Sequence, residues 1–200
     1  MDEKKHFEIL KNTKYESLIL CWRNNVETRK NSINQDIVST ENHKRWLSSQ
    51  LNKKDTKLIM NFYNSEPAGL IKLDLLKKNQ YGISINLNPD YRGMNLSTGF
   101  IRDSIHYLLE NQEDKNIEIL ASIKPHNVPS IKSFTRAGFK LTKKSYQQGL
   151  QLYSLNMINS KNILILGYKN SENPLIKFLT SKNFNVTNTA DRLDFEEFQK

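Results

Sequence analysis

The chain has 200 residues, of which 37% are apolar, and this composition excludes a disordered protein and allows one domain with an appendage or two small domains. Its net charge of +9 arises from lysines and arginines that are scattered as singles and pairs, so we expect no nucleic acid partner. The single cysteine, Cys21, excludes an internal disulfide framework, and no apolar run reaches the roughly 18 residues of a membrane span. We therefore expect a soluble cytoplasmic protein.

Helices follow a short strand in the first quarter of the chain. Apolar residues at helical spacing, together with capping residues, carry this interpretation. The predicted elements are a strand at Phe7–Leu10, a helix at Tyr15–Trp22, a short helix or turn at Val26–Arg29, and a helix that Ser39 or Thr40 caps.

Strands dominate the middle of the chain. Alternating apolar residues predict strands at Lys57–Tyr63, Ala68–Leu76 and Tyr81–Leu87, the first two joined as a hairpin. Later patterns predict a helix from Leu96, a strand at Ile117–Ile123, a helix that begins at Asn127 and ends at Gly138, and strands at Phe139–Lys144 and Leu150–Met157.

A tight polar loop, Asn88–Ser97, joins the strand at Tyr81–Leu87 to the next helix. The start of a helix presents unpaired backbone N–H groups and the positive end of a dipole, which suit an anion such as phosphate. Arg92 adds positive charge, and Gly93 allows close approach of the backbone. We therefore expect a pyrophosphate to bind at this loop.

The apolar pattern restarts near the end of the chain. Asn162–Gly167 is a continuous apolar run typical of a buried parallel strand, and a helix at Pro174–Lys182, a strand at Asn185–Thr187 and a short helix at Asp194–Gln199 follow it. We expect a main domain at residues 1–158 and a small α/β extension at residues 159–200. The extension would either pack on the main domain or open a larger domain, because it is too small to bury both faces of a sheet.

Two motifs resemble the GNAT acyltransferase superfamily. Arg92-Gly93-Met94-Asn95-Leu96-Ser97 resembles its pyrophosphate loop, Arg/Gln-x-x-Gly-x-Gly/Ala, with Asn95 and Ser97 where the motif has Gly and Gly/Ala. Asn127–Phe139 resembles its Asn-x-x-(Ala/Ser)-x-x-x-(Tyr/Phe)-x-x-x-Gly-Phe helix. The resemblance covers roughly residues 5–157. It implies an α+β fold in which helices flank a central, mixed, mostly antiparallel sheet.

The resemblance implies an N-acetyltransferase that uses acetyl-CoA as cosubstrate and needs no metal. The strand before the loop would bond the pantetheine arm through its main chain, the loop would hold the pyrophosphate, and the second motif would line the far side of the arm. The residues implied to bind the cofactor are Ile85, Leu87, Arg92, Gly93, Met94, Asn95, Leu96, Ser97, Asn127, Ser130 and Phe134.

A third region narrows the resemblance. Trp22–Arg29 and Ser39–Leu47 look like a branch that begins with Trp-Arg-Asn and carries a Glu-x-His-x-x-Trp helix. This branch includes enzymes that acetylate nucleotide-linked amino sugars in pseudaminic acid and related surface-glycan pathways, and also enzymes that acetylate protein N-termini. The substrate contacts implied are Asn24, Arg29, Trp46 and Asp74, each of which also has an ordinary structural role as a cap, surface ion-pair member, core residue or strand-end carboxylate.

The catalytic groups are His43 and Tyr153 by our interpretation. Histidine has a suitable pKa for a base, although a helix-surface or partly buried histidine also fits the pattern at His43. Many superfamily members place a general-acid tyrosine where this chain has Phe134, which has no proton to donate. Tyr153, Ser133, Tyr146 or a water would then protonate the thiolate, unless it leaves unaided.

Three further expectations complete the interpretation. The segment that begins at Asn162 is similar to the first βαβ unit of sugar N-formyltransferases, but the catalytic parts of those enzymes have no counterpart here. The substrate is expected to be a small molecule, and a homodimer is possible. The rival functions are acetylation of a protein N-terminus or small amine, and a CoA-binding or interaction module without catalysis.

Overall fold

A computed structural model describes residues 5–112, 114, 116–144, 147–157, 162–166 and 185–189. The chain divides into two compact units, Met1–Met157 and Ile158–Lys200. In the described ranges, no helix is both long enough and apolar enough to cross a lipid bilayer.

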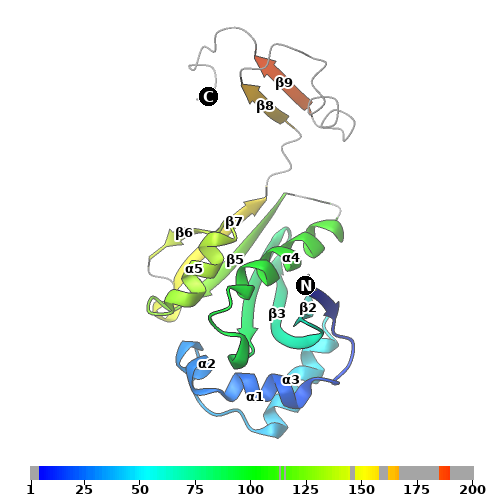
Figure 1. Ribbon diagram of the computed structural model, residues 1–200, viewed down its shortest axis with the longest axis vertical. Coiled ribbons are helices and arrows are strands. Elements are labelled where there is room, and N and C mark those ends of the chain that lie inside the picture. Colours follow the sequence, from blue (N-terminus) through cyan, green and yellow to red (C-terminus); the bar gives the residue numbers. More distant parts are fainter. Residues whose placement is uncertain are drawn as a thin grey trace. The chain divides into compact units, whose positions relative to one another are not determined.

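The first unit contains a mixed sheet with helices on both of its faces (Figure 1). Its elements in chain order are β1 (Lys5–Ile9), α1 (Glu16–Asn24), α2 (Val26–Asn31), α3 (Thr40–Leu51), β2 (Thr56–Tyr63), β3 (Glu66–Lys77), β4 (Gln80–Leu87), α4 (Leu96–Glu110), β5 (Ile117–Ile123), α5 (Val128–Arg136), β6 (Lys140–Lys143) and β7 (Gln151–Met157). The predicted order of elements is confirmed, and the segment left as a helix or turn is the helix α2.

The described strands of this unit form a seven-stranded sheet in the order β1-β2-β3-β4-β5-β7-β6. All neighbours are antiparallel except β4 and β5, which are parallel. The predicted α+β architecture, a mixed and mostly antiparallel sheet between helices, is confirmed.

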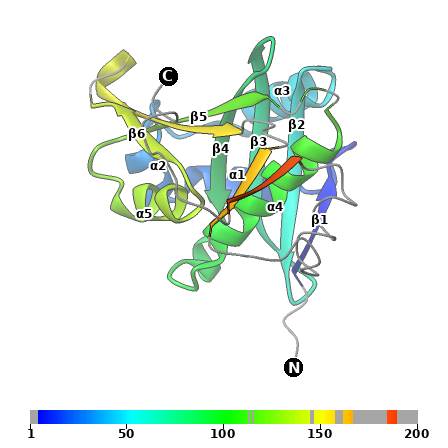
Figure 2. The same cartoon turned by 90° about the horizontal axis from the view of Figure 1, so that it is seen from above.

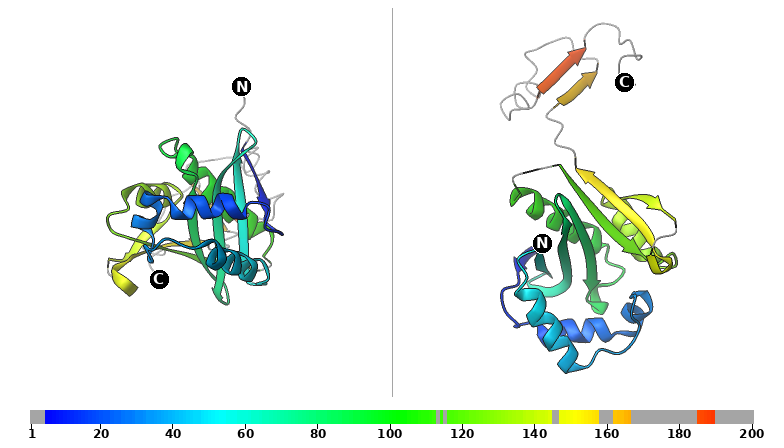
Figure 3. Two further views of the ribbon diagram at one scale, coloured as in Figure 1. Left: turned by 90° about the horizontal axis from the view of Figure 1, so that it is seen from below. Right: turned by 180° about the vertical axis from the view of Figure 1, so that it is seen from behind.

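The two faces of the sheet bury separate apolar clusters. Ile71, Leu73 and Ile83 pack with α4 on one face, whereas Leu58, Met60 and Leu70 pack with α1 and α3 on the other. Figure 2 shows α4 in front of the sheet, and the left view of Figure 3 shows α1 and α3 in front from the opposite side. The alternation of side chains along β2, β3 and β4 produces this division.

Local capping explains where the helices begin and end. The Ser39 side chain accepts a hydrogen bond from the Asn42 backbone N–H at the start of α3. The Asn127 side chain does the same for the Ser130 N–H at the start of α5, and Gly138 follows that helix with a φ of +105°. The predicted N-cap and terminator of α5 are therefore confirmed.

In the second unit, β8 (Asn162–Leu166) pairs in parallel with β9 (Asn185–Thr189). The two strands were predicted, and so was the parallel arrangement. The helices predicted at Pro174–Lys182 and Asp194–Gln199 lie outside the described residues.

The feature that positions the functional site is the separation of β4 from β5. Their pairing covers only Gln80–Gly82 against Glu118–Leu120, and β5 then continues with β7 alone. The two strands diverge beyond this point in Figure 1 and in the right view of Figure 3. The last part of β4, from Ile83 to Leu87, therefore has β3 on one side and a gap on the other.

Candidate active site

Two cavities meet at the separated end of β4. The smaller has a volume of about 310 Å³ and lies among β4, α2, the Asn88–Ser97 loop and the first turns of α5. The larger, of about 640 Å³, lies among α1, the α2–α3 loop, α3, β3 and β4. Both are lined by Thr28, Ser32, Ile85 and Asn86, so the two cavities adjoin at the end of β4.

The main chain of Ile85 and Leu87 faces the gap between β4 and β5. The Asn79 carbonyl, just before β4, accepts a bond from the Glu118 N–H of β5, whereas the Asn88 N–H, just after β4, donates to Ala68 of β3. Backbone groups alternate in direction along a strand, so the odd-numbered residues between them present their N–H and C=O groups toward β5. Beyond Gly82 these groups have no partner strand on that side among the described strands. This separation of the two strands is the one that the family resemblance implied for holding an extended ligand arm.

The loop before α4 leaves the start of that helix open to an anion. Gly93 has a φ of +82°, and Asn95 adopts the left-handed conformation with φ 58° and ψ 19°. The Asn95 side chain makes no capping hydrogen bond, and no acidic residue lies in the first turn of α4. The Asn95 Oδ1 instead accepts a bond from Arg136 Nη1 at 3.0 Å. Uncapped N–H groups at a positive helix end suit a phosphate group.

The Arg92 side chain holds the loop against α2. Its Nη1 donates to Asn25 Oδ1 at 2.9 Å, and its Nη2 donates to Thr28 Oγ1 at 2.6 Å. Burial lowers the pKa of Arg92, while the nearby Glu27 carboxylate raises it. The contribution of Arg92 to the site is therefore partly mechanical, because it places α2 as a wall of the smaller cavity. Thr28 was not selected from the sequence, because only the tertiary contact with Arg92 brings it there.

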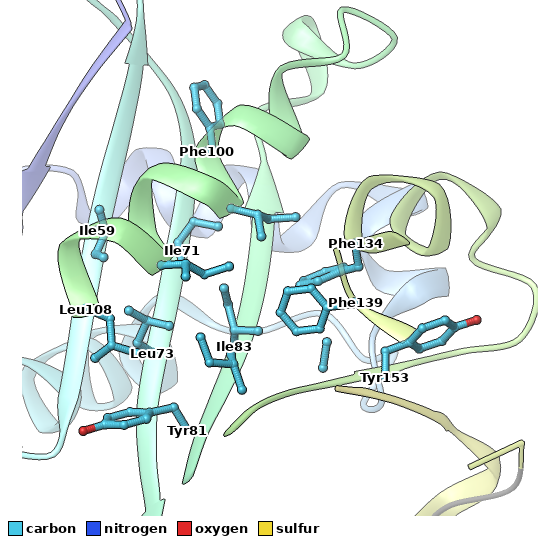
Figure 4. Packing of buried hydrophobic residues seen from close by; sticks show 14 of the residues in the cluster. Ile59, Ile71, Leu73, Tyr81, Ile83, Phe100, Leu108, Phe134, Phe139 and Tyr153 are labelled. Atoms are coloured by element: carbon cyan, nitrogen blue, oxygen red, sulfur yellow. The ribbon is translucent and has the colours of Figure 1, made fainter. Parts of the chain in front are cut away.

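The second motif forms the opposite wall of the smaller cavity. Asn127, Ser130 and Ser133 line it, together with Pro129. Phe134, predicted to bind the cofactor, lies in the core instead: it is 2% exposed, and its ring packs edge-on against Phe139 with centroids 5.0 Å apart (Figure 4). It supports α5 from beneath as a member of the core cluster.

The larger cavity contains a guanidinium with an unused donor. Arg23 Nη2 donates to the Asn34 carbonyl at 2.8 Å, but Nη1 is buried and has no hydrogen-bond partner among the described residues. Burial lowers the pKa of Arg23, as does the neighbouring Arg29, while Asp36 raises it. Arg23 lies within the Trp-Arg-Asn pattern but was not selected, because the sequence does not show that its fork turns into a cavity.

His43, which lines the larger cavity, also has an unpartnered ring nitrogen among the described residues. The residue is 2% exposed, its ring lies 5.3 Å from that of Trp46, and its Nε2 has no partner among the described residues. Burial lowers the pKa of His43 below its ordinary value of 6.5, although a hydrogen bond to the Glu16 backbone opposes the shift. The ring is therefore neutral near pH 7 and can accept a proton.

Four of the predicted catalytic and substrate-binding residues are not among the lining residues of either cavity in the described part of the chain, and neither are Gly93, Met94, Asn95, Leu96 and Phe134 of the predicted cofactor-binding residues. The Asn24 side chain bonds both backbone groups of Val38, and Arg29 Nη1 donates to the Gln35 carbonyl at 2.9 Å, so both fasten the α2–α3 loop. Asp74 pairs with Lys72 at 2.7 Å and accepts a bond from Thr56.

Tyr153 is the fourth of these residues. It is 5% exposed, and its hydroxyl donates to Gln151 Oε1 at 3.0 Å, directed away from the core cluster in Figure 4. It lies on β7, on the far side of β5 from the gap, so the structure does not bring it to the proposed reacting groups. Tyr146, an alternative proton donor, lies outside the described residues.

Comparison with known proteins identifies the kind of protein to which the chain is similar. The sequence model of the Acetyltransferase (GNAT) family matches residues 15–139. No curated protein matches the sequence.

Several solved structures share the fold. Spermidine N-acetyltransferase from Vibrio cholerae, in complex with CoA and spermine, is 10% identical with a TM-score of 0.68 over 76% of this chain and 95% of its own. Aminoglycoside acetyltransferase AAC(6′)-Ib, in complex with coenzyme A, is 15% identical with a TM-score of 0.65 over 76% and 95%. Campylobacter jejuni N-acetyltransferase PseH is 15% identical with a TM-score of 0.58 over 76% and 97%.

Proposed function

The chain belongs to the GNAT acetyltransferase family, whose acetyl donor is acetyl-CoA, and from this premise we propose that it acetylates the amino group of a nucleotide-linked amino sugar. The smaller cavity takes the donor and the larger cavity takes the acceptor. The two substrates meet at the end of β4, where both cavities share Ile85 and Asn86.

The donor side rests on the open start of α4 and the free edge of β4. The pyrophosphate of acetyl-CoA binds the backbone N–H groups from Gly93 to Ser97. The pantetheine arm extends along the gap and exchanges hydrogen bonds with the main chain of Ile85 and Leu87, which have no partner strand there. Asn127 and Ser130 contact the arm from α5.

The observation that carries the acceptor assignment is the unused buried Nη1 of Arg23. A guanidinium recognises phosphate through paired hydrogen bonds, and a buried unpaired donor is costly until such a partner arrives. Lys72 also lines the cavity but is paired with Asp74, and Asp36 is the one carboxylate among the described lining residues. The free donor of Arg23 favours an anionic acceptor such as a nucleoside diphosphate sugar over a polyamine or an aminoglycoside.

The rim of the larger cavity fits the remainder of such an acceptor. Trp46 is 36% exposed and Ile37 is 71% exposed, and both line the cavity. Large apolar side chains with this exposure offer a surface on which a nucleobase or sugar ring can stack. We therefore propose that Trp46 contacts the acceptor, whereas Asn24 and Arg29 act on it by fastening the loop that carries Ile37.

Turnover measurements with different amines test the proposal. Thiol release from acetyl-CoA is expected with a UDP-linked amino sugar, and the same amino sugar without its nucleotide is the matched control for the anionic group. Turnover confined to peptides or to spermidine would contradict the amino sugar assignment. CoA binding in calorimetry without turnover on any amine would favour the non-catalytic module.

His43 is proposed to accept the proton that the amine loses. His43→Gln is expected to lower kcat by about 100-fold while KM for acetyl-CoA stays unchanged, because a positioned base contributes about 10²–10⁴-fold. Burial lowers the pKa of His43, so the neutral ring that accepts the proton persists below pH 6.5. In the wild type, the fall of kcat on the acid side of its pH profile should therefore occur below pH 6.5. In His43→Gln this fall should be absent. A loss confined to KM for the acceptor would assign His43 to binding instead.

For residues 158–200 we infer the start of an α/β unit like that of sugar N-formyltransferases. The parallel pairing of β8 with β9 supports this inference. No second activity is proposed for these residues.

A further inference from the structure

The Asn86 side chain occupies the junction of the two cavities. Asn86 pairs with Leu70 of β3, so its backbone is used on the β3 side, and its side chain lines both cavities. Its Oδ1 is buried from solvent and has no hydrogen-bond partner among the described residues. The sequence pointed to the main chain of this strand and not to this side chain.

A buried carbonyl without a donor is destabilising, so its presence at a junction indicates a donor that arrives with a ligand. Neither cation that lines the larger cavity donates to this carbonyl. Arg23 Nη1 has no hydrogen-bond partner among the described residues, and Lys72 pairs with Asp74. A substrate N–H group is a donor that the proposed reaction brings to this point.

We propose that Asn86 Oδ1 accepts a hydrogen bond from the acceptor's amino group and directs the nitrogen lone pair toward the thioester carbon. This assignment rests on the proposed function. The amine nitrogen forms the new C–N bond, the C–S bond breaks, and CoA leaves as the thiolate. The proton lost by the nitrogen goes to neutral His43, because an amide oxygen such as that of Asn86 orients an N–H but does not take its proton at neutral pH.

The neighbouring main chain makes this orientation productive. Ile85 and Leu87 flank Asn86 and present their N–H groups toward the gap, where the thioester would lie. One strand thus supplies backbone donors on the donor side and a side-chain acceptor on the acceptor side. Holding both reactants at adjacent residues of one strand reduces the freedom lost on reaching the transition state.

The test removes the side-chain carbonyl of Asn86 while keeping the size of the side chain. Asn86→Leu, which is close in size but accepts no hydrogen bond, is expected to lower kcat with a UDP-linked amino sugar by about 100-fold. Its calorimetric Kd for CoA should stay within about twofold of wild type, since the pyrophosphate and main-chain contacts are unchanged. Asn86→Asp, which keeps an oxygen acceptor, should retain more of kcat than Asn86→Leu does.

Gln80→Leu is the matched control. Gln80 lies on the same face of β4 at the end that pairs with β5, and it is not among the described lining residues of either cavity, so the same change of amide to leucine should leave kcat within about threefold of wild type. If a thermal melt shows that Asn86→Leu does not fold, Asn86→Ala tests the loss of the same hydrogen bond.

Three results would overturn the inference. They are an unchanged kcat in the leucine or alanine variant, a loss explained by weaker CoA binding, and an equal loss in the aspartate variant. A wild-type protein that binds CoA but acetylates no amine would overturn the proposed function, and with it the role of Asn86. If the wild type turns over normally and the Asn86 variant is equally active, only the role of Asn86 is overturned.

Discussion

Replacing Gly93 by aspartate is expected to abolish CoA binding, with a Kd at least about 100-fold higher in calorimetry. Gly93 has a φ of +82°, a conformation that L side chains rarely adopt, and a side chain there would face open space just before the start of α4. The added carboxylate would lie beside the pyrophosphate, and two like unit charges 4 Å apart repel by ~4 kcal/mol near a protein surface. Since each 1.4 kcal/mol is about tenfold in Kd, repulsion alone exceeds the expected loss.

Gly149→Asp separates charge repulsion from backbone strain. Gly149 has a φ of +73° and equally open surroundings, but it precedes β7 and is not part of the Asn88–Ser97 loop. Both variants should lose similar stability in a thermal melt, and only Gly93→Asp should lose CoA. Gly93→Asn, which tolerates this backbone and adds no charge, should retain most of the affinity. An unchanged affinity in Gly93→Asp would contradict the assignment of the loop.

The donor half of the site was predictable because local patterns encode it. Asn95 tolerates the left-handed conformation that this loop adopts before α4, Asn127 caps the helix that it begins, and alternation along Tyr81–Leu87 places a strand before the loop. Each of these features depends on residues within a few positions of one another. Phe134 was assigned to the cofactor site from its motif position alone. That position does not reveal that its ring packs in the core beside Phe139.

The acceptor half was less predictable because tertiary contacts build it. Asn24 and Arg29 are polar and adjacent to the Trp-Arg-Asn pattern, but the fold uses both to bond backbone groups of the α2–α3 loop. Arg23 is equally polar, and only the packing of α1 on the sheet decides that its Nη1 is left buried and unpartnered among the described residues. Sequence spacing does not distinguish these cases, because all three side chains come from the same turns of α1 and α2.

Arg23→Met is the second variant with a large expected effect. It keeps the apolar stem but removes the guanidinium, and KM for a UDP-linked amino sugar should rise by about 100-fold, since a hydrogen bond to a charged group contributes about 1.5–3 kcal/mol. KM for acetyl-CoA should not change, because Arg23 does not line the smaller cavity. With the free amino sugar as acceptor, wild type and variant should differ little, because that acceptor carries no phosphate for Arg23 to bind.

Arg29→Met is the control that isolates recognition from loop tethering. Arg23 and Arg29 each donate to a carbonyl of the α2–α3 loop, at 2.8 Å to Asn34 and 2.9 Å to Gln35, but only Arg23 lines the larger cavity. If the anionic acceptor binds Arg23, the Arg29 variant should keep its acceptor KM within about threefold while losing comparable stability. Equal increases in KM would mean that both arginines act by holding the loop. Because the two side chains make the same kind of tether, any excess effect at Arg23 measures the contact of its free Nη1 with the substrate.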